Sequence, residues 1–444
     1  MTPAGYDNIR AALNGVTIER PLGQVCGILE GTIEVSGLNR LVAIGDRVRI
    51  GATGRELMGE IVGAEGTKMR VLPDGSAGGL RIGDDVAVMG VTTVSPDDSW
   101  IGRIVDPAGR PLDGRPLLPG PTNRSLAARA PAAADRRTMG ARIETGLRAF
   151  NTLLPIVRGQ RIGLFAGSGV GKSSLLAALA RRLDADVVVF AMIGERSREI
   201  RDAVERGLGP DGMARTVIIA ATADAPATER ARCLPAALSV AEHHRDAGKH
   251  VLLLADSITR HAEAHRQVAG ARGETPVFGG YPASMPTDIA ALCERAGPGA
   301  EGQGDITAVF TVLVAGGDHD GPVADTLRGI LDGHIVLDRR IAERGRFPAV
   351  DLSRSVSRSL PEAASDHENT LIAETRRLIG AYERSEMMIK AGLYAAGSDR
   401  TLDAAIESWA RIDTFLSQSE AGTMQDSFVA LARCLSRRGQ GGGE

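Results

Sequence analysis

The segment that decides the fold reads Leu164-Phe165-Ala166-Gly167-Ser168-Gly169-Val170-Gly171-Lys172-Ser173-Ser174. It follows an apolar run typical of a strand and opens a helical pattern from Leu175 to Leu183, which is the setting that a P-loop requires. Glycines let backbone N–H groups turn inward around phosphate oxygens, and a helix N-terminus adds partial positive charge. We therefore expect residues 166–174 to bind a nucleoside triphosphate. Lys172 would reach the β- and γ-phosphates, and the Ser173 hydroxyl would bind Mg²⁺.

The lysine of this motif is a rare residue in the chain. Only four lysines, Lys68, Lys172, Lys249 and Lys390, stand against 48 arginines. A chance match to the relaxed motif therefore has odds of roughly one in a hundred. The alternative is a glycine-rich turn that binds nothing, and these odds disfavour it. The first position of the motif is Ala166 instead of glycine, a change that we expect the site to tolerate.

Length and composition limit the classes of protein. The 444 residues predict two to four domains. The 52 basic and 55 acidic residues give a net charge of −3, and aromatic residues make up only 3%. Both values disfavour a nucleic-acid binder that relies on charge or base stacking. The four cysteines form no CxxC pair, so we expect neither a zinc site nor a disulfide framework. We expect no transmembrane helix and no cleaved secretion signal.

The pattern of the sequence divides the chain into four segments. Residues 1–20 have a helical apolar spacing, which predicts either a partner-binding helix or a frayed terminus. Short β-rich runs cut by glycines predict a β-barrel domain over residues 21–97. Apolar runs alternate with helical patterns in residues 98–358, which predicts a mostly parallel α/β domain entered through a connecting segment at 98–136. Residues 359–444 have helical patterns and predict an all-α domain.

Two acidic residues follow strand-like runs, where a nucleotide site needs them. Asp256 ends the run that begins at His250, and we expect it to hold Mg²⁺ directly or through water. The alternative is an aspartate that bonds its own turn. Glu195 follows the run that begins at Val187 and would polarise the attacking water. Taken alone, Glu195 is explained better as a carboxylate in the first turn of a helix.

Phosphoryl transfer also gains from an arginine supplied by a second molecule, which speeds the reaction by about 10³–10⁵. The segment from Phe347 to Arg358 offers two candidates, Arg354 and Arg358. Spacing alone does not distinguish between them.

These motifs together resemble the superfamily of rotary and secretion ATPases. That superfamily contains the α and β subunits of ATP synthase, the type III secretion ATPases and, more distantly, the transcription terminator Rho. Pro348-Ala349-Val350-Asp351 followed by Ser355-Val356-Ser357-Arg358 is similar to its signature. The resemblance covers nearly the whole chain. It implies an N-terminal β-barrel, a central RecA-like P-loop domain and a C-terminal helical domain.

The same resemblance implies roles for individual residues. Arg358 would be the arginine finger that acts on the neighbouring subunit, and Glu195 would be the catalytic carboxylate. Arg196 and Arg260 would face the phosphates. Phe347 would stack on adenine.

Within the superfamily the chain is most similar to the export ATPases, and in particular to the flagellar ones. The similarity lies in Ala166, in Gly279-Gly280-Tyr281-Pro282 and in Gly397-Ser398-Asp399. It implies a homohexamer that hydrolyses ATP with Mg²⁺ and so energises flagellar type III protein export, releasing chaperones and unfolding substrates. A virulence injectisome ATPase is the first alternative, and a Rho-like RNA translocase is the second.

The resemblance also implies partners and a location. The expected partners are further copies of the chain, a peripheral-stalk-like negative regulator, a central-stalk-like export component, export chaperones with their substrates, and the membrane export gate. No nucleic acid is expected among them. The expected location is the cytoplasm, peripherally associated with the inner membrane at the flagellar base.

Overall fold

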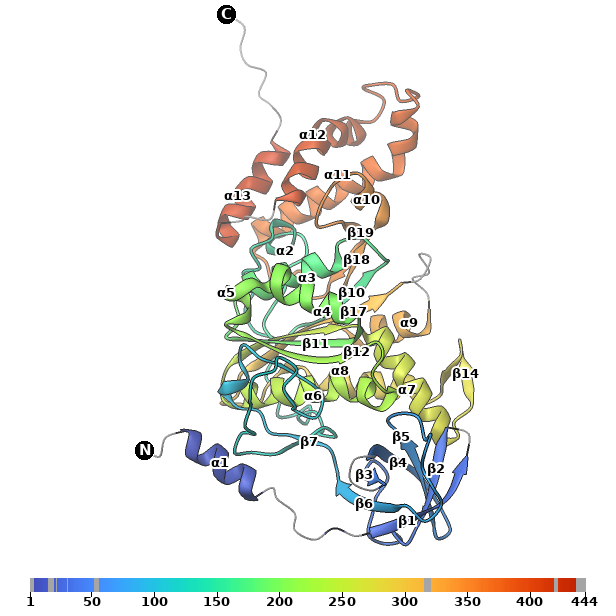
Figure 1. Cartoon of the computed structure of the whole chain (residues 1–444). Coiled ribbons are helices and arrows are strands. Elements are labelled where there is room, and N and C mark those ends of the chain that lie inside the picture. Colours follow the sequence, from blue (N-terminus) through green and yellow to red (C-terminus); the bar gives the residue numbers. More distant parts are fainter. Residues whose placement is uncertain are drawn as a thin grey trace, which may run out of the picture.

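The computed structural model describes residues 4–14, 20, 22–29, 31–51, 56–314, 321–418 and 422–436. These residues form three parts, with a β-barrel at one end, an α/β part in the middle and a helical part at the other end (Figure 1). The predicted fold class is therefore confirmed. The outer parts of the predicted segments 1–20 and 359–444, at 1–3, 15–19 and 437–444, lie outside the described residues.

The barrel is closed by six antiparallel strands in the order β1-β2-β5-β4-β3-β6. Side chains alternate between the interior and the surface, most regularly in β2 and β3, because successive residues of a strand point to opposite faces. Valine and isoleucine side chains such as Ile33, Val48 and Val71 fill the interior. The strands are β1 (Leu22–Leu29), β2 (Thr32–Ser36), β3 (Arg47–Ile50), β4 (Leu57–Glu65), β5 (Lys68–Pro73) and β6 (Asp85–Gly90).

A nine-stranded sheet forms the middle part, with its main path in the order β19-β18-β10-β17-β13-β11-β12-β8. Neighbours on this path are parallel except β18 and β19, and β16 pairs with β17 in the antiparallel sense. The strands are β8 (Ile104–Val105), β10 (Arg161–Ala166), β11 (Val187–Glu195), β12 (Thr216–Thr222), β13 (His250–Asp256), β16 (Gly297–Pro298), β17 (Asp305–Leu313), β18 (Gly333–Leu337) and β19 (Val350–Ser357).

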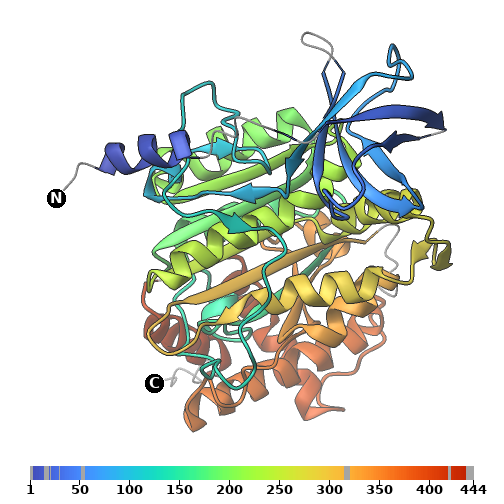
Figure 2. The ribbon, with the colours of Figure 1, turned by 90° about the horizontal axis from the view of Figure 1, so that it is seen from below.

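The parallel strands are buried on both faces, as their continuous apolar runs predict. Helices α6 (Ala227–Asp246), α7 (Ile258–Arg272), α8 (Met285–Arg295) and α9 (Pro322–Ile330) cover the face on the side of the barrel. Figure 2 looks onto this face. The other face carries α2 (Arg148–Asn151), α3 (Lys172–Arg182), α4 (Ser197–Asp202), the π-helical turn η2 (Ala203–Leu208) and α5 (Gly209–Met213).

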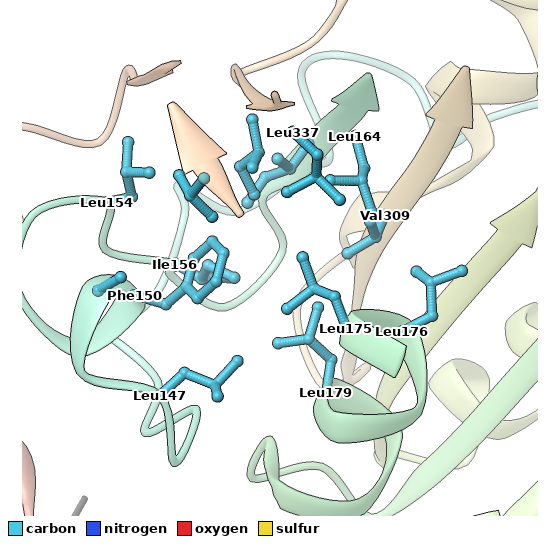
Figure 3. Packing of buried hydrophobic residues seen from close by; sticks show 14 of the residues in the cluster. Leu147, Phe150, Leu154, Ile156, Leu164, Leu175, Leu176, Leu179, Val309 and Leu337 are labelled. Atoms are coloured by element: carbon cyan, nitrogen blue, oxygen red, sulfur yellow. The ribbon is translucent and has the colours of Figure 1, made fainter. Parts of the chain in front are cut away.

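Helix α3 is fixed by leucines that face the sheet. Leu175, Leu176 and Leu179 pack towards β10, β17 and β18 (Figure 3). Each buried leucine stabilises the fold by about 1.5–3 kcal/mol. The apolar face of α3 therefore anchors the P-loop that precedes it.

Short elements lie at and after the start of the connecting segment. Strand β7 (Thr93–Val94) precedes the segment and pairs with β9 (Arg124–Ser125) inside it, and the 3-10 turn η1 (Asp98–Trp100) opens it. A second small ribbon, β14 (Pro276–Phe278) with β15 (Tyr281–Pro282), follows α7.

Three long helices form the C-terminal part, namely α11 (Asp366–Lys390), α12 (Arg400–Ser417) and α13 (Met424–Leu435). The short helix α10 (Arg339–Glu343) and strand β19 precede them. Ser365 with Glu368 caps the start of α11, and Thr423 with Asp426 caps α13. The Tyr382 and Trp409 rings stack at 3.8 Å between α11 and α12. Among the described helices, none combines the length and apolar content that crossing a membrane requires.

The N-terminal helix α1 (Ala4–Asn14) lies beside the middle part. Asn8 donates a hydrogen bond to Asp97 at 2.6 Å. Ile9 and Leu13 keep 50% and 68% of their surface exposed. The helical pattern predicted in residues 1–20 is therefore present over these residues, with apolar side chains left uncovered.

Candidate active site

The P-loop lies between the end of β10 at Ala166 and the start of α3 at Lys172, so the predicted strand–turn–helix setting is present. Gly169 and Gly171 have φ angles of 75° and 90°, a left-handed backbone that glycine adopts without strain. The loop lines a cavity of about 760 Å³. Val170 is buried in the core, so only its backbone can serve the site.

A buried ion pair lies at the inner end of this cavity. Asp256 is the last residue of β13 and is buried, and Lys172 Nζ pairs with its carboxylate. Thr311 of β17, the strand next to β13, donates its hydroxyl to Asp256 Oδ1 at 2.8 Å. The carboxyl ends of parallel strands meet at one edge of a sheet, where α/β proteins bind their ligands. The fold thus brings together two residues that lie 84 positions apart.

Glu195 ends β11 at the same edge and retains only 6% of its surface exposed. Arg260 Nε lies 3.4 Å from Glu195 Oε1, and the Arg260 guanidinium also donates to the Gly194 carbonyl. Burial raises the pKa of Glu195 to about 8, helped by a hydrogen bond with Glu199 and by the charge of Asp256. The same hydrogen bond lowers the pKa of Glu199. The two carboxyl groups therefore share one proton near neutral pH.

Glu199 also lines the cavity, although no sequence motif marked it as a site residue. It lies in the first turn of α4, where its carboxylate accepts the Arg196 backbone N–H at 3.3 Å. The available signal was a second carboxylate shortly after Glu195, in the first turn of the helix that follows the strand.

The remaining predicted residues differ in their relation to the cavity, since Arg196 and Phe347 are not among the residues that line it. Arg260 lines it, and Ser173 and Ser174 line it from the exposed start of α3. Arg196 precedes α4 and is exposed. Phe347 is 48% exposed and lies beside the P-loop, because a methyl group at Gly171 would come within 3.2 Å of its ring.

Arg358 follows β19 and does not line the cavity of its own chain. Its guanidinium donates to the carbonyl groups of Leu331 at 3.1 Å and Arg328 at 3.2 Å. Arg354 instead pairs with Asp338 at 2.5 Å and Asp351 at 2.6 Å. The Arg354 charge is therefore matched by carboxylates, whereas the exposed Arg358 rests on uncharged acceptors.

The donor atoms at this edge fit Mg²⁺. The Ser173 hydroxyl and the Asp256 carboxylate both border the cavity, and hard oxygen donors are what Mg²⁺ prefers. Over the described parts of the chain, no cluster of three His, Cys, Asp or Glu side chains could hold a metal ion alone. One hydroxyl and one carboxylate suit Mg²⁺ that is bound by one or two protein oxygens together with the phosphates of a nucleotide.

Comparison with known proteins identifies two sequence profiles in the chain. The ATP synthase alpha/beta family, nucleotide-binding domain, matches residues 146–357. The T3SS EscN ATPase C-terminal domain matches residues 364–433. The first match spans the P-loop, Glu195 and Asp256, and it ends at Ser357 just before Arg358.

Similar proteins come from flagellar and virulence systems. The flagellum-specific ATP synthase of Caulobacter vibrioides is 41% identical over 95% of this chain and 97% of its own length. The SPI-2 type 3 secretion system ATPase of Salmonella typhimurium is 43% identical over 82% of this chain and 84% of its own. The assembled ATPase EscN of enteropathogenic E. coli, in complex with its central stalk EscO, has a TM-score of 0.85 at 34% identity. That comparison covers 93% of this chain and all of EscN. The chain therefore belongs to the ATP synthase alpha/beta family, among the flagellum-specific and type III secretion ATPases, and is itself an ATPase.

Proposed function

We propose that identical copies of this chain assemble into a homohexamer that hydrolyses ATP between neighbouring subunits and so energises flagellar type III protein export. One observation carries the proposal. Lys172, Glu195 and Asp256 gather at one cavity, whereas Arg358 lies outside that cavity and donates to the carbonyl groups of Leu331 and Arg328. One copy thus offers an incomplete site, and a ring of head-to-tail contacts would complete every site at once.

Each residue has a part in this reaction. When ATP binds, the Lys172 ammonium group would leave its ion pair with Asp256 and contact the β- and γ-phosphates instead. In its ionised form, Glu195 would then orient and polarise the attacking water, with Arg260 holding its carboxylate in place. Arg358 of the next subunit would stabilise the charge that spreads over the γ-phosphoryl oxygens. Mg²⁺, held by Ser173 and Asp256, would supply charge neutralisation on the phosphates.

Two further residues would hold the rest of the nucleotide. Phe347 lies against Gly171 at the mouth of the P-loop, where its half-exposed ring can stack on adenine. Arg196 is exposed at the start of α4 and would approach the phosphates from solvent. The segment from Ala166 to Ser174 supplies the backbone N–H groups that surround them.

The proposed partners follow from the family and from exposed surfaces. The central stalk of assembled EscN supports a central-stalk-like export component for this chain. The uncovered Ile9 and Leu13 side chains of α1 support contact with a peripheral-stalk-like negative regulator. Export chaperones with their substrates and the membrane export gate complete the set. We place the protein in the cytoplasm, peripherally associated with the inner membrane at the flagellar base.

An injectisome ATPase is the second candidate, supported by the 43% identity to the SPI-2 enzyme. The flagellar function is favoured because the Caulobacter relative matches over more of both chains. Deleting the gene separates the two. Loss of flagella with secretion of virulence proteins intact supports the first function, and the reverse result supports the second.

The shared site is tested by mixing inactive variants. The Lys172→Ala variant lacks the lysine that would contact the phosphates, and the Arg358→Ala variant lacks the proposed arginine finger. In a random equal mixture about a quarter of the interfaces join an intact cavity to an intact finger. Turnover should therefore recover to about a quarter of the wild-type value.

The control for this experiment mixes Lys172→Ala with Glu195→Gln. Both changes damage the same side of the interface, so every site contains one defect and no activity should return. Recovery in the control, or none in the first mixture, contradicts a site built from two subunits.

A further inference from the structure

The strand that leads into the P-loop touches the last turn of α9. Phe165, directly before Ala166, is completely buried on the α9 face of the sheet. The Arg328 guanidinium lies 5.2 Å from the centroid of the Phe165 ring. Cations within about 6 Å of an aromatic face are attracted to it, and more strongly when water is excluded. Arg328 is thereby fixed to the P-loop strand of its own subunit.

The same turn of α9 receives the arginine finger. Arg358 donates to the carbonyl groups of Arg328 and Leu331. Its backbone N–H also donates to the Asp332 carbonyl at 3.0 Å. These side-chain contacts use two of the five N–H groups of a guanidinium, so the other three can face a neighbouring subunit.

His334 also belongs to this cluster of Phe165, Arg328 and Arg358. Its ring meets the Phe165 ring edge-on, with centroids 5.9 Å apart and planes at 80°. Burial lowers the pKa of His334, and the charges of Arg328 and Arg358 lower it further. The ring is therefore neutral at physiological pH and adds no charge that would repel the two arginines.

We propose that Arg328 is a positioning residue that couples the P-loop of a subunit to the arginine finger which that subunit presents to its neighbour. The inference rests on the proposed role of Arg358. One residue makes both contacts, since the Arg328 side chain lies on Phe165 and its carbonyl holds Arg358. A shift of β10 when phosphate occupies the P-loop would move the finger with it.

The first test measures turnover and nucleotide binding of Arg328→Gln. We expect kcat to fall about tenfold, with KM and the affinity for a fluorescent ADP analogue unchanged, because the cavity itself is intact. Arg328→Lys keeps a cation over the ring and should recover most of kcat. Arg339→Ala is the matched control, since Arg339 lies on the surface and pairs with Glu343 at 3.0 Å.

Double variants test the route of the effect. If Arg328 acts through the finger, Arg328→Gln combined with Arg358→Ala is no slower than Arg358→Ala alone. If it acts from the Phe165 ring, Arg328→Gln with Phe165→Leu is no slower than the slower single variant. Radiolabelled phosphate release is sensitive enough for these slow enzymes, and circular dichroism checks that each variant is folded.

The possible results separate this inference from the function on which it rests. Wild-type turnover of Arg328→Gln, or independent multiplication of its defect with that of Arg358→Ala, overturns the positioning role. A loss caused by raised KM or weakened ADP binding also overturns it. Full turnover of Arg358→Ala would instead remove the shared-site function itself.

Discussion

Replacing Glu195 by glutamine should change how the stability of the empty enzyme depends on pH. In the unfolded chain this carboxyl has a pKa of 4.5, and burial raises it to about 8 in the folded chain. Because the folded pKa is the higher one, the folded state binds more protons between these values. The stability contributed by this proton is complete below pH 4.5 and is lost as the pH rises to about 8.

The size of the effect follows from the two pKa values. Each unit corresponds to about 1.4 kcal/mol, so the rise from about pH 6 to about pH 8 removes at most about 3 kcal/mol. Glu199 does not reverse this fall in stability with rising pH, because its lowered pKa leaves it ionised throughout that range. Glu195→Gln cannot ionise and should lack this fall.

The assay is thermal unfolding without nucleotide at a series of pH values. The midpoint temperature of unfolding of Glu195→Gln should exceed that of the wild type by several degrees near pH 9. The difference should become smaller towards pH 6. Glu343→Gln, which changes an exposed glutamate paired with Arg339, is the control and should follow the wild type. A constant difference at every pH would refute a buried proton on Glu195.

Three further results are expected. Arg358→Ala should lower kcat by about 10³-fold or more. Arg354→Ala should leave ATP turnover within a factor of about two, since its guanidinium already pairs with Asp338 and Asp351. Equal losses of the two variants in steady-state assays would contradict the assignment of Arg358 as the finger. Phe347→Ala should raise the KM for ATP about fivefold and Phe347→Tyr should not, so an unchanged KM in both would exclude stacking. Chelation of Mg²⁺ should stop turnover while ADP binding weakens only partly, and undiminished phosphate release in excess chelator would contradict the metal assignment.

The sequence predicted the P-loop and the buried parallel strands because both are local patterns. The run from Leu164 to Ser174 contains its own strand end, turn and helix start. Strands such as β11 and β13 are continuously apolar, so their burial on both faces could be inferred directly. The three-part architecture followed from where these patterns change.

The edge of the sheet could not be predicted in the same way. Strand β19 contains Asp351, Ser353 and Arg354 among its eight residues, and this composition is typical of a loop. Its strand form depends on antiparallel pairing with β18. A local sequence pattern cannot predict this long-range pairing, and the pairing determines where Arg358 lies.

Long-range partners account for the other differences. The spacing of residues in the sequence did not distinguish Arg354 from Arg358 as candidates for the arginine finger, whereas their contacts in the structure do. The sequence did not mark Glu199 as a site residue, because its importance comes from its hydrogen bond with the Glu195 carboxyl group at the end of β11.

The closed barrel has a consequence for how copies of the chain can meet. Each of its six strands already has a neighbour on both sides, so the barrel offers no free strand edge with which another chain could share backbone hydrogen bonds. Any contact that a second copy makes with the barrel must therefore use surfaces other than strand edges.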